Sequence, residues 1–345
     1  MPIVYVSEPG ARVHKAQGRL VIRKGETVLE SVPLEQVERL VVMGRGVSVT
    51  TAILFALALR GVEVVFLSSR GSYISRVVGA EHKHSRLRHR QALVVEDAAR
   101  ALAVSRAIVA GKLHNQRVLV QRHAEGAPWA AAALEQMKAL ARRVPEAPDL
   151  DALRGLEGRA AALYFALFRR LLRPPDDGGS WGFRRRAYRP PPDPINALLS
   201  LGYTYLLYEV IAACQLAGLD PYQGFFHTLD YGKPSLALDL MEEFRPLIAD
   251  SLVLYAVNRR VIRRRDFRVR RPAAPDANGR PLPVTLTREA HKRFAALYES
   301  RLLQQVFYPP LGERTTYRRV MHLQAQHMAR YILGRDAEYR PFTVR

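Results

Sequence analysis

The sequence predicts an α+β fold, in which an N-terminal β-strand-rich domain is followed by a larger all-α domain. Two patterns predict it. Up to about residue 80, the apolar residues form short, alternating, β-branched runs separated by turn residues such as Lys24-Gly25. From Gln91 onwards, they recur at the spacing of amphipathic helices. Because 345 residues suffice for two domains, we place these at residues 1–80 and 92–345, with a basic linker at 81–91.

The chain is strongly basic, with a formal net charge of +21. Such an excess attracts polyanions, so nucleic acid is the expected partner. The single cysteine, Cys214, excludes an internal disulfide and a zinc site built from cysteines. The start, MPIVYVSEPG, lacks the basic-then-apolar order of a signal peptide, and no uninterrupted apolar run reaches membrane-spanning length. We therefore expect a cytoplasmic protein with no membrane partner.

The first domain is predicted to consist of strands and one short helix. Residues 50–60 form the helix, which is capped by Thr50 or Thr51 and ended by Gly61. No catalytic set of side chains stands out in this domain, so we expect it to be a scaffold or an oligomer interface. The predicted strands are the runs IVYV, RLVIR, TVLESV, VERLVVM, VEVVFL and SYISRVV.

The linker stretch EHKHSRLRHR, residues 81–90, contains three histidines among arginines. Because like charges repel a metal cation, His82, His84 and His89 do not favour a metal site. We interpret the stretch as a solvated hinge that can touch phosphate.

The helical domain opens with residues 91–124, which form one long helix or a broken pair, and with a second helix at 127–144. The next helix begins near Leu153 and carries one acid, Glu157, on an otherwise apolar face. A carboxylate there is costly unless it is paired or bound to metal. Pairing with an arginine such as Arg154 and binding to a metal are both open at this point.

Residues 174–194 form a loop in which arginines alternate with aromatic residues. This mixture suits a nucleic-acid backbone and unstacked bases, although an ordinary charged surface loop has the same composition. The arginines are Arg184, Arg185, Arg186 and Arg189, and the aromatic residues are Trp181, Phe183 and Tyr188.

A helix then starts at Asp193-Pro194, an N-cap followed by a first-turn proline. Asn196, Ser200 and Tyr203 share one face of this apolar helix, and such a polar stripe implies buried hydrogen-bond partners.

The stretch from Gly224 to Pro246 places His227 shortly before a set of acids. Ser235 is expected to cap a helix that runs to about residue 257, and Pro246 is expected to kink it. On that helix four acids fall on one face. A histidine and several carboxylates suit a divalent metal, although an acidic helix face is also a common solvated surface. The four acids are Asp239, Glu242, Glu243 and Asp250.

The chain after Asn258 is again strongly basic, in the run RRVIRRRDFRVRRP. The arginines between Arg259 and Arg271 form either a surface that follows phosphates or a solvated helix face. A turn-rich insert from Ala273 to Pro283 and two more helical stretches complete the sequence.

Three separated segments, taken in their order and spacing, resemble the CRISPR-associated integrase family, the Cas-one proteins of spacer acquisition. The N-terminal ending GVEVVFLSSRGSYISRV is also similar to that family. The three segments are LEGRAAALYF, RPPPDPINALLSLGYTYL and GLDPYQGFFHTLDYGKPSLALDLMEEFRP.

The resemblance implies a β domain, a flexible linker and a helical catalytic domain that forms a homodimer and assembles with the small Cas-two protein. It also implies a divalent metal, Mg²⁺ or Mn²⁺, held by a glutamate, a histidine and a further acid. Glu157, His227 and Glu242 stand in these three positions. Asp239 matches a nearby family acid, either a supporting residue or an alternate ligand, and Glu243 is expected to be a bystander.

The function implied is that of an integrase and metal-dependent DNA endonuclease of CRISPR adaptation, which joins the 3′-hydroxyl ends of prespacer DNA to the CRISPR repeat by transesterification. Two alternatives are a nuclease that does not integrate DNA and a non-catalytic nucleic-acid-binding scaffold. Arg245 is also a candidate for pairing with Glu242 or Glu243. The expected contacts to the DNA backbone are Arg184, Arg185, Arg186, Arg245, Arg259 and Arg263.

Overall fold

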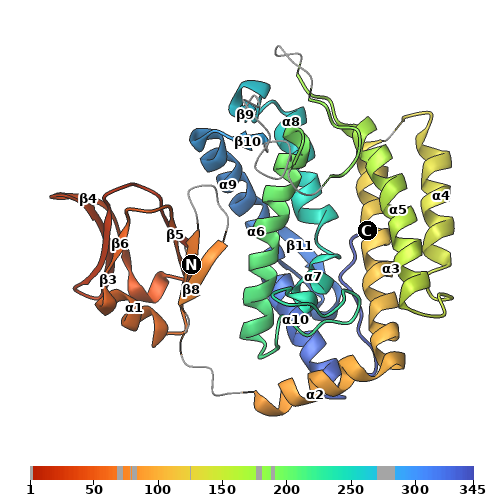
Figure 1. Cartoon of the computed structure of the whole chain (residues 1–345), viewed down its shortest axis with the longest axis horizontal. Helices are drawn as coiled ribbons and strands as arrows, with labels where there is room; N and C mark the ends of the chain where they lie inside the picture. The colour runs from red at the N-terminus through yellow and green to blue at the C-terminus, as the bar shows by residue number, and fades with distance from the viewer. Residues whose placement is uncertain are drawn as a thin grey trace. The chain divides into compact units, whose positions relative to one another are not determined.

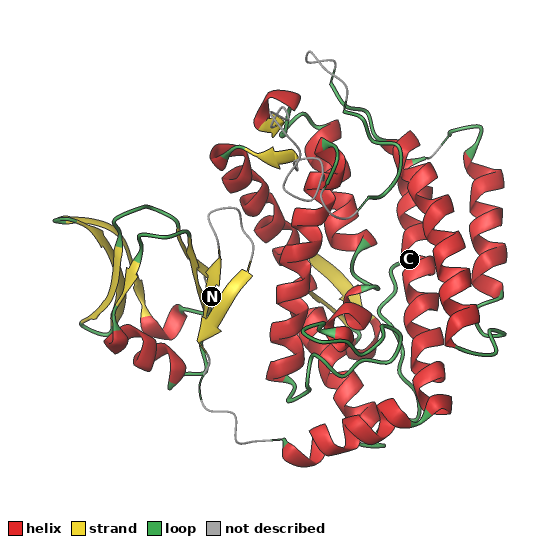
Figure 2. Cartoon of the chain, viewed as in Figure 1, coloured by secondary structure: helices red, strands yellow, loops and turns green. Residues whose placement is uncertain are grey.

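The protein divides into two compact units, Met1–Lys83 and His84–Arg345. The computed structural model describes residues 3–67, 73–77, 79, 84–124, 126–175, 181–187, 191–269 and 284–345. The first unit is rich in strands and the second is mostly helical (Figures 1 and 2). The α+β fold class is therefore confirmed.

The first unit contains two four-stranded sheets. One has the order β1 (Ile3–Val6), β5 (Arg39–Met43), β7 (Glu63–Leu67), β8 (Tyr73–Val77), with parallel pairs except for the antiparallel β7–β8 pair. The other has the order β4 (Thr27–Pro33), β3 (Arg19–Lys24), β2 (Arg12–Ala16), β6 (Ser48–Val49). The six predicted strands are all present, whereas β2 and β6 were not predicted.

Helix α1 (Thr51–Ala58) shares one apolar core with strands of both sheets. Ile53 and Leu57 of the helix are fully buried in that core. Thr50 precedes the helix as predicted, but its side chain makes no capping hydrogen bond. The short 3₁₀-helix η1 (Leu34–Gln36) connects β4 to β5.

The second unit begins with α2 (Ser85–Glu96) and α3 (Ala98–His123), so the stretch predicted as linker is helical from Ser85. The first helical stretch is a broken pair, because the Asp97 carboxylate accepts hydrogen bonds from the first backbone amides of α3. Helices α4 (Ala130–Arg142) and α5 (Leu150–Leu171) follow.

Helix α6 (Pro194–Leu216) has Asp193 as its N-cap and Pro194 in its first turn, as predicted. It is long and apolar enough to cross a membrane by length and composition alone, contrary to the expectation that no apolar run reaches that length. It packs against other helices of the unit, and Asn196 and Glu209 are buried within it. These are the properties of the core helix of a folded unit. Cys214 is a buried free thiol.

The rest of the unit contains the short helix α7 (Ser235–Met241), the π-helix η2 (Pro246–Asp250) and α8 (Ser251–Asn258). Helices α9 (Arg288–Leu303) and α10 (Tyr317–Ile332) follow after the 3₁₀-helix η3 (Arg264–Asp266). The unit is not purely helical, since β9 (Phe267–Val269) pairs with β10 (Val284–Leu286), and β11 (Gln305–Tyr308) pairs with β12 (Glu313–Thr316). The 3₁₀-helix η4 (Pro309–Leu311) joins the second pair. The insert from Ala273 to Pro283 lies outside the described residues.

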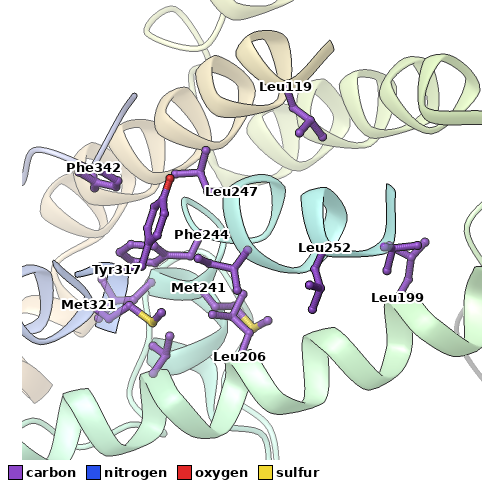
Figure 3. Close-up of a cluster of buried hydrophobic side chains, with 14 of the residues drawn as sticks. Leu119, Leu199, Leu206, Met241, Phe244, Leu247, Leu252, Tyr317, Met321 and Phe342 are labelled. Atoms are coloured by element: carbon purple, nitrogen blue, oxygen red, sulfur yellow. The ribbon is translucent and has the colours of Figure 1, made fainter. Parts of the chain in front are cut away.

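A large apolar core joins α3, α6, the α7–α8 region, α10 and the end of the chain. Figure 3 shows Leu119, Leu206, Phe244 and Met321 of these elements together with Phe342. Phe342 stacks on Phe244 with ring centroids 6.0 Å apart. The chain end is thus part of the packing that surrounds the segment after α7.

The single helix predicted from Ser235 to about residue 257 is interrupted. Ser235 is its first residue rather than its cap, and its hydroxyl donates to the carbonyl of Thr228. After Met241 the chain tightens, since the amides of Phe244 and Arg245 both donate to the carbonyl of Met241. Pro246 has no N–H to continue the helical ladder, and the π-helix starts at this residue. The predicted kink is a change of helix type.

Candidate metal centre

His227 lies in the loop between α6 and α7, and the buried carboxylate of Asp239 fixes this loop. The amides of Phe225, Phe226 and His227 all donate to Asp239, over 2.6, 3.0 and 2.9 Å. Gly224 lets the loop approach α7, because a Cβ there would lie 2.4 Å from the carbonyl carbon of Ser235. The sequence therefore presents His227 on a rigid loop.

Asp239 also sets the orientation of the imidazole ring. Nδ1 of His227 donates to Asp239 Oδ1 over 2.7 Å. An ionised carboxylate only accepts hydrogen bonds, so Nδ1 carries a proton, and in the neutral form of the ring the lone pair is on Nε2. Histidines that bind metals are commonly oriented by a carboxylate in this way. Nε2 lies 3.7 Å from Glu242 Oε1.

Glu242, directly after α7, is buried among three basic groups. Lys112 Nζ lies 2.6 Å from its Oε2, and an Arg245 guanidinium nitrogen lies 3.0 Å from its Oε1. Burial alone would raise the pKa of Glu242, but Arg245, Lys112 and His227 outweigh it and lower the pKa to about 2. Glu242 is therefore a carboxylate in the folded protein, which is the form that a metal binds.

Glu157 reaches the same place from α5. Its Oε1 lies 2.6 Å from Lys112 Nζ, so the lysine of α3 bridges Glu157 and Glu242. Burial would lower the pKa of Lys112, but the two glutamates outweigh it and raise the pKa. Arg154, the partner considered from the sequence, instead pairs with Asp151 and donates to the carbonyl of Phe226.

The four predicted acids do not share one face. Glu243 points away from His227 and bonds to Tyr339 and to the amide of Phe342. Asp250 accepts hydrogen bonds from the hydroxyls of Tyr203 and Tyr164, over 2.6 and 2.7 Å. The turn after Met241 and the π-helix rotate these side chains away from the positions that a regular helix would give them. Of these four acids, only Asp239 and Glu242 face His227.

Among the described residues, no three side chains of the His, Cys, Asp and Glu types meet as a closed metal cage. The group that lies between Glu157 and Glu242 is the ammonium of Lys112, which contacts one oxygen of each glutamate. The donor set nevertheless fits a divalent ion, because imidazole and carboxylate groups suit Mn²⁺ and carboxylates suit Mg²⁺. A separation of 3.7 Å between His227 Nε2 and Glu242 Oε1 can be spanned by an ion bonded to each at about 2.1 Å.

The polar face of α6 finds the buried partners that the sequence predicts. Asn196 accepts hydrogen bonds from the Arg186 side chain and the amide of Ala187, and Ser200 accepts a second one from Arg186. The Arg186 and Arg245 guanidinium groups both lie over the ring of Tyr203, 5.2 and 5.1 Å from its centre. Arg186 and Arg245 are therefore half-buried and bonded within the protein, and for Arg245 the pairing with Glu242 is found.

The other predicted DNA contacts lie on the surface. Arg184, Arg185, Arg259 and Arg263 are exposed. His84 and His89 are exposed as well. The remaining candidates, His82, Tyr188, Arg189, Arg270 and Arg271, lie outside the described residues.

The sequence prediction missed Lys112, the residue that joins the two glutamates. Its only local signal is a lone lysine inside the apolar run around VAGKLHN of α3, where 6% of the residue is exposed. A buried lysine needs a carboxylate partner, but the partners are 45 and 130 residues away in sequence. Only the fold identifies them.

The comparison with protein families gives a clear result: the family model described as CRISPR associated protein Cas1 matches residues 4–300. The chain belongs to the Cas1 family. A Thermus thermophilus protein named CRISPR-associated endonuclease Cas1 3 is 40% identical over 346 residues, which cover 99% of this chain and 97% of that protein. A Rhodospirillum rubrum protein named CRISPR-associated endonuclease Cas1 2 is 38% identical over 349 residues, covering 98% and 97%.

Solved structures agree with the fold. A CAS1 protein from Thermotoga maritima superimposes with a TM-score of 0.79 at 21% identity and covers both chains completely. A casposase bound to integration product has a TM-score of 0.81 at 20% identity, covering 99% of this Cas1 chain and 93% of the other. The predicted family and fold class are thus confirmed, and the names of the relatives at 38–40% identity confirm the enzyme class of an endonuclease.

Proposed function

We propose that this Cas1 protein is a metal-dependent DNA integrase and endonuclease of CRISPR adaptation. It joins the 3′-hydroxyl ends of prespacer DNA to the CRISPR repeat by transesterification, as a homodimer in complex with the small Cas2 protein. One observation carries the proposal: an imidazole with a free Nε2, held by Asp239, lies beside Glu242, and Lys112 joins Glu242 to Glu157. The cytoplasmic location predicted from the sequence is part of the same proposal.

Two solved structures support the partner and the reaction. One chain of a structure titled Cas6-RT-Cas1--Cas2 complex superimposes with a TM-score of 0.78, covering 99% of this chain and 36% of that one. The casposase with TM-score 0.81 is bound to integration product. At 24% and 20% identity these likenesses concern the fold, so Cas2 and DNA as partners of this chain belong to the proposal.

In the proposed site, Glu157, His227 and Glu242 would hold Mg²⁺ or Mn²⁺. Such an ion would lower the pKa of the attacking hydroxyl and neutralise charge that develops on the phosphate. Asp239 keeps a proton of His227 on Nδ1, so the lone pair of Nε2 is available to bind the ion. Lys112 and Arg245 balance the charge of Glu242 and fix the orientation of its carboxylate, since each contacts a different oxygen.

The proposed reaction is balanced without a further reactant. The 3′ oxygen of the prespacer loses its proton and forms a bond to phosphorus, while the bond from that phosphorus to the 3′ oxygen of the repeat strand breaks. The departing oxygen takes up a proton, and the number of phosphodiester bonds is unchanged. When water attacks instead, the same site cleaves DNA.

The surface arginines supply the affinity for DNA in this proposal. Arg184, Arg185, Arg259 and Arg263 are exposed, and the chain carries a net charge of +21. Contacts from such residues to phosphates give binding that weakens with salt and depends little on sequence.

A supercoiled-plasmid assay with Cas2, a repeat-containing target and 3′-hydroxyl prespacer DNA tests the function. The wild-type protein is expected to join the DNA strands in Mg²⁺ or Mn²⁺, and Glu157→Ala and His227→Ala are expected to abolish joining while DNA binding persists. Cleavage without joining would favour the nuclease that does not integrate. Unchanged activity in both variants would favour a non-catalytic scaffold. Prespacer that ends in a 3′-phosphate is the matched control, because it lacks the attacking hydroxyl.

A further inference from the structure

The end of the chain, residues 339–345, lies behind the candidate metal centre; we call it the C-terminal tail. It runs beside α3, where Figure 1 places the C-terminus. Besides α10, the tail contacts two short segments, Glu243 after α7 and Gly111–Asn115 of α3. Each segment also carries a residue of the candidate site, Glu242 in the first and Lys112 in the second.

Glu243 fastens the first segment to the tail. Its Oε1 accepts a hydrogen bond of 2.5 Å from the hydroxyl of Tyr339, and its Oε2 accepts one from the amide of Phe342. Gln324 of α10 donates to the same carboxylate over 3.0 Å. Glu243 is buried, so these bonds hold the backbone immediately after Glu242 at a fixed place.

Asn115 fastens the second segment and joins it to the first. Its amide donates to the carbonyls of Glu243 and Phe342, over 2.8 and 2.9 Å, and its oxygen accepts from the amide of Val344 over 3.1 Å. Asn115 is fully buried and lies one helical turn after Lys112. One side chain thus ties α3, the segment after α7 and the tail together.

Gly111, next to Lys112, allows the tail to lie this close to α3. A Cβ at residue 111 would be 2.5 Å from Cβ and 2.8 Å from Cγ of Pro341. Real Cβ atoms do not approach other atoms this closely, so any larger residue at this position must move the proline ring and with it the tail.

We propose that the docked tail is a positioning element of the metal centre, which sets the place of Glu242 relative to Lys112 and so the geometry offered to the ion. The inference rests on the proposed metal site. Glu243, which contacts the tail, is adjacent to Glu242, and Gly111, which also contacts the tail, is adjacent to Lys112. A movement of the tail that displaces Glu243 or Gly111 therefore displaces the neighbouring site residue as well. The tail residues themselves do not touch the ion.

The test releases the tail without changing a residue of the candidate site. Gly111→Ala forces Pro341 away, and Pro341→Gly in the same chain removes the atoms that clash. We expect Gly111→Ala to speed chymotryptic cleavage after Phe342, which is buried in the docked tail, and to weaken Mn²⁺ binding, measured by calorimetry, by about 10-fold, the lower range for supporting contacts of a metal site. The Mn²⁺ affinity of the double variant, Gly111→Ala with Pro341→Gly, is expected to lie within about threefold of the affinity of Pro341→Gly alone.

Faster cleavage in Gly111→Ala with unchanged Mn²⁺ affinity would overturn the inference. If the tail stays docked in this variant, a truncated chain that ends at Glu338 is tested instead. The inference is supported if this chain folds and binds Mn²⁺ more weakly than the wild type. It is overturned if the chain folds and keeps the wild-type affinity, or if it does not fold, because the tail is then simply part of the core. A failure of the proposed metal site is distinguishable from a failure of this inference. In that case the wild-type protein would not bind Mn²⁺, or Glu157→Ala would leave the Mn²⁺ affinity unchanged.

Discussion

His227 Nδ1 donates to Asp239 Oδ1 over 2.7 Å, while the same carboxylate accepts the backbone amide of His227 over 2.9 Å. One aspartate thus fixes both the ring and the main chain of the histidine. This double contact explains how a loop residue can act as a well-placed ligand, and it leads to the first prediction.

Asp239→Asn is expected to weaken Mn²⁺ binding by about 10-fold or more, as loss of a supporting contact of a metal-binding histidine does. An asparagine has one acceptor oxygen, so its amide group must face either the imidazole N–H or the amides of Phe225 and Phe226. Calorimetric titration with Mn²⁺ measures the effect. Asp230→Asn is the matched control, because Asp230 is exposed in the same loop. Equal affinity in both variants would contradict the role of Asp239.

The fold could be predicted from the sequence where local patterns determine it. Alternating β-branched runs identified six strands, and Asp193-Pro194 identified the start of α6, because capping depends on residues close in sequence. The strands β2 and β6 were missed. The run of β2, RVHKA, is too polar to stand out, and β6 has two residues.

The candidate site could be predicted only in part. Glu157, His227 and Glu242 follow from the family resemblance, but the role of Lys112 depends on pairing between distant segments. The direction of Glu243 also could not be predicted, because the periodicity of a regular helix fails where the chain tightens before Pro246. Residues are assigned to one helix face correctly only if the helix continues.

Lys112→Met is expected to destabilise the metal-free protein by about 3–5 kcal/mol, the range for removing one partner of a buried ion pair. The variant leaves Glu157 and Glu242 close together without the ammonium group that lies between them. Thermal unfolding in EDTA and in Mn²⁺ measures this, and Mn²⁺ is expected to raise the melting temperature more in the variant than in the wild type. Lys138→Met is the control, since the pair of Lys138 with Glu135 is exposed. A melting temperature equal to that of the wild type in EDTA would refute the bridging role.

Asp250 is expected to make stability fall as pH rises from about 4 to about 6. Burial raises its pKa to about 6, although Tyr203, Tyr164 and Arg245 act in the opposite direction. Over this interval the unfolded chain loses the proton, whose ordinary pKa is 3.8, while the folded protein keeps it. The folded state then binds more protons, so the free energy of unfolding decreases with pH.

Asp250→Asn removes this proton and is expected to make the decrease less steep, measured as the free energy of unfolding in urea between pH 4 and pH 6.5. The exposed Asp230→Asn variant is expected to keep the wild-type slope. A slope that is identical in all three proteins would show that Asp250 does not titrate in this interval.

The arginines of residues 184–186 are expected to separate into two kinds. Arg184 and Arg185 are exposed, so replacing both with alanine is expected to weaken DNA binding and to reduce the slope of log affinity against log salt by up to about 2, about 0.9 for each lost phosphate contact. Fluorescence anisotropy at several salt concentrations measures the slope. Arg186 instead bonds to Asn196 and Ser200, so Arg186→Ala is expected to lower the melting temperature. The opposite pattern, a large change of salt slope from Arg186→Ala with an unchanged melting temperature, would place Arg186 on the DNA and remove it from the support of α6.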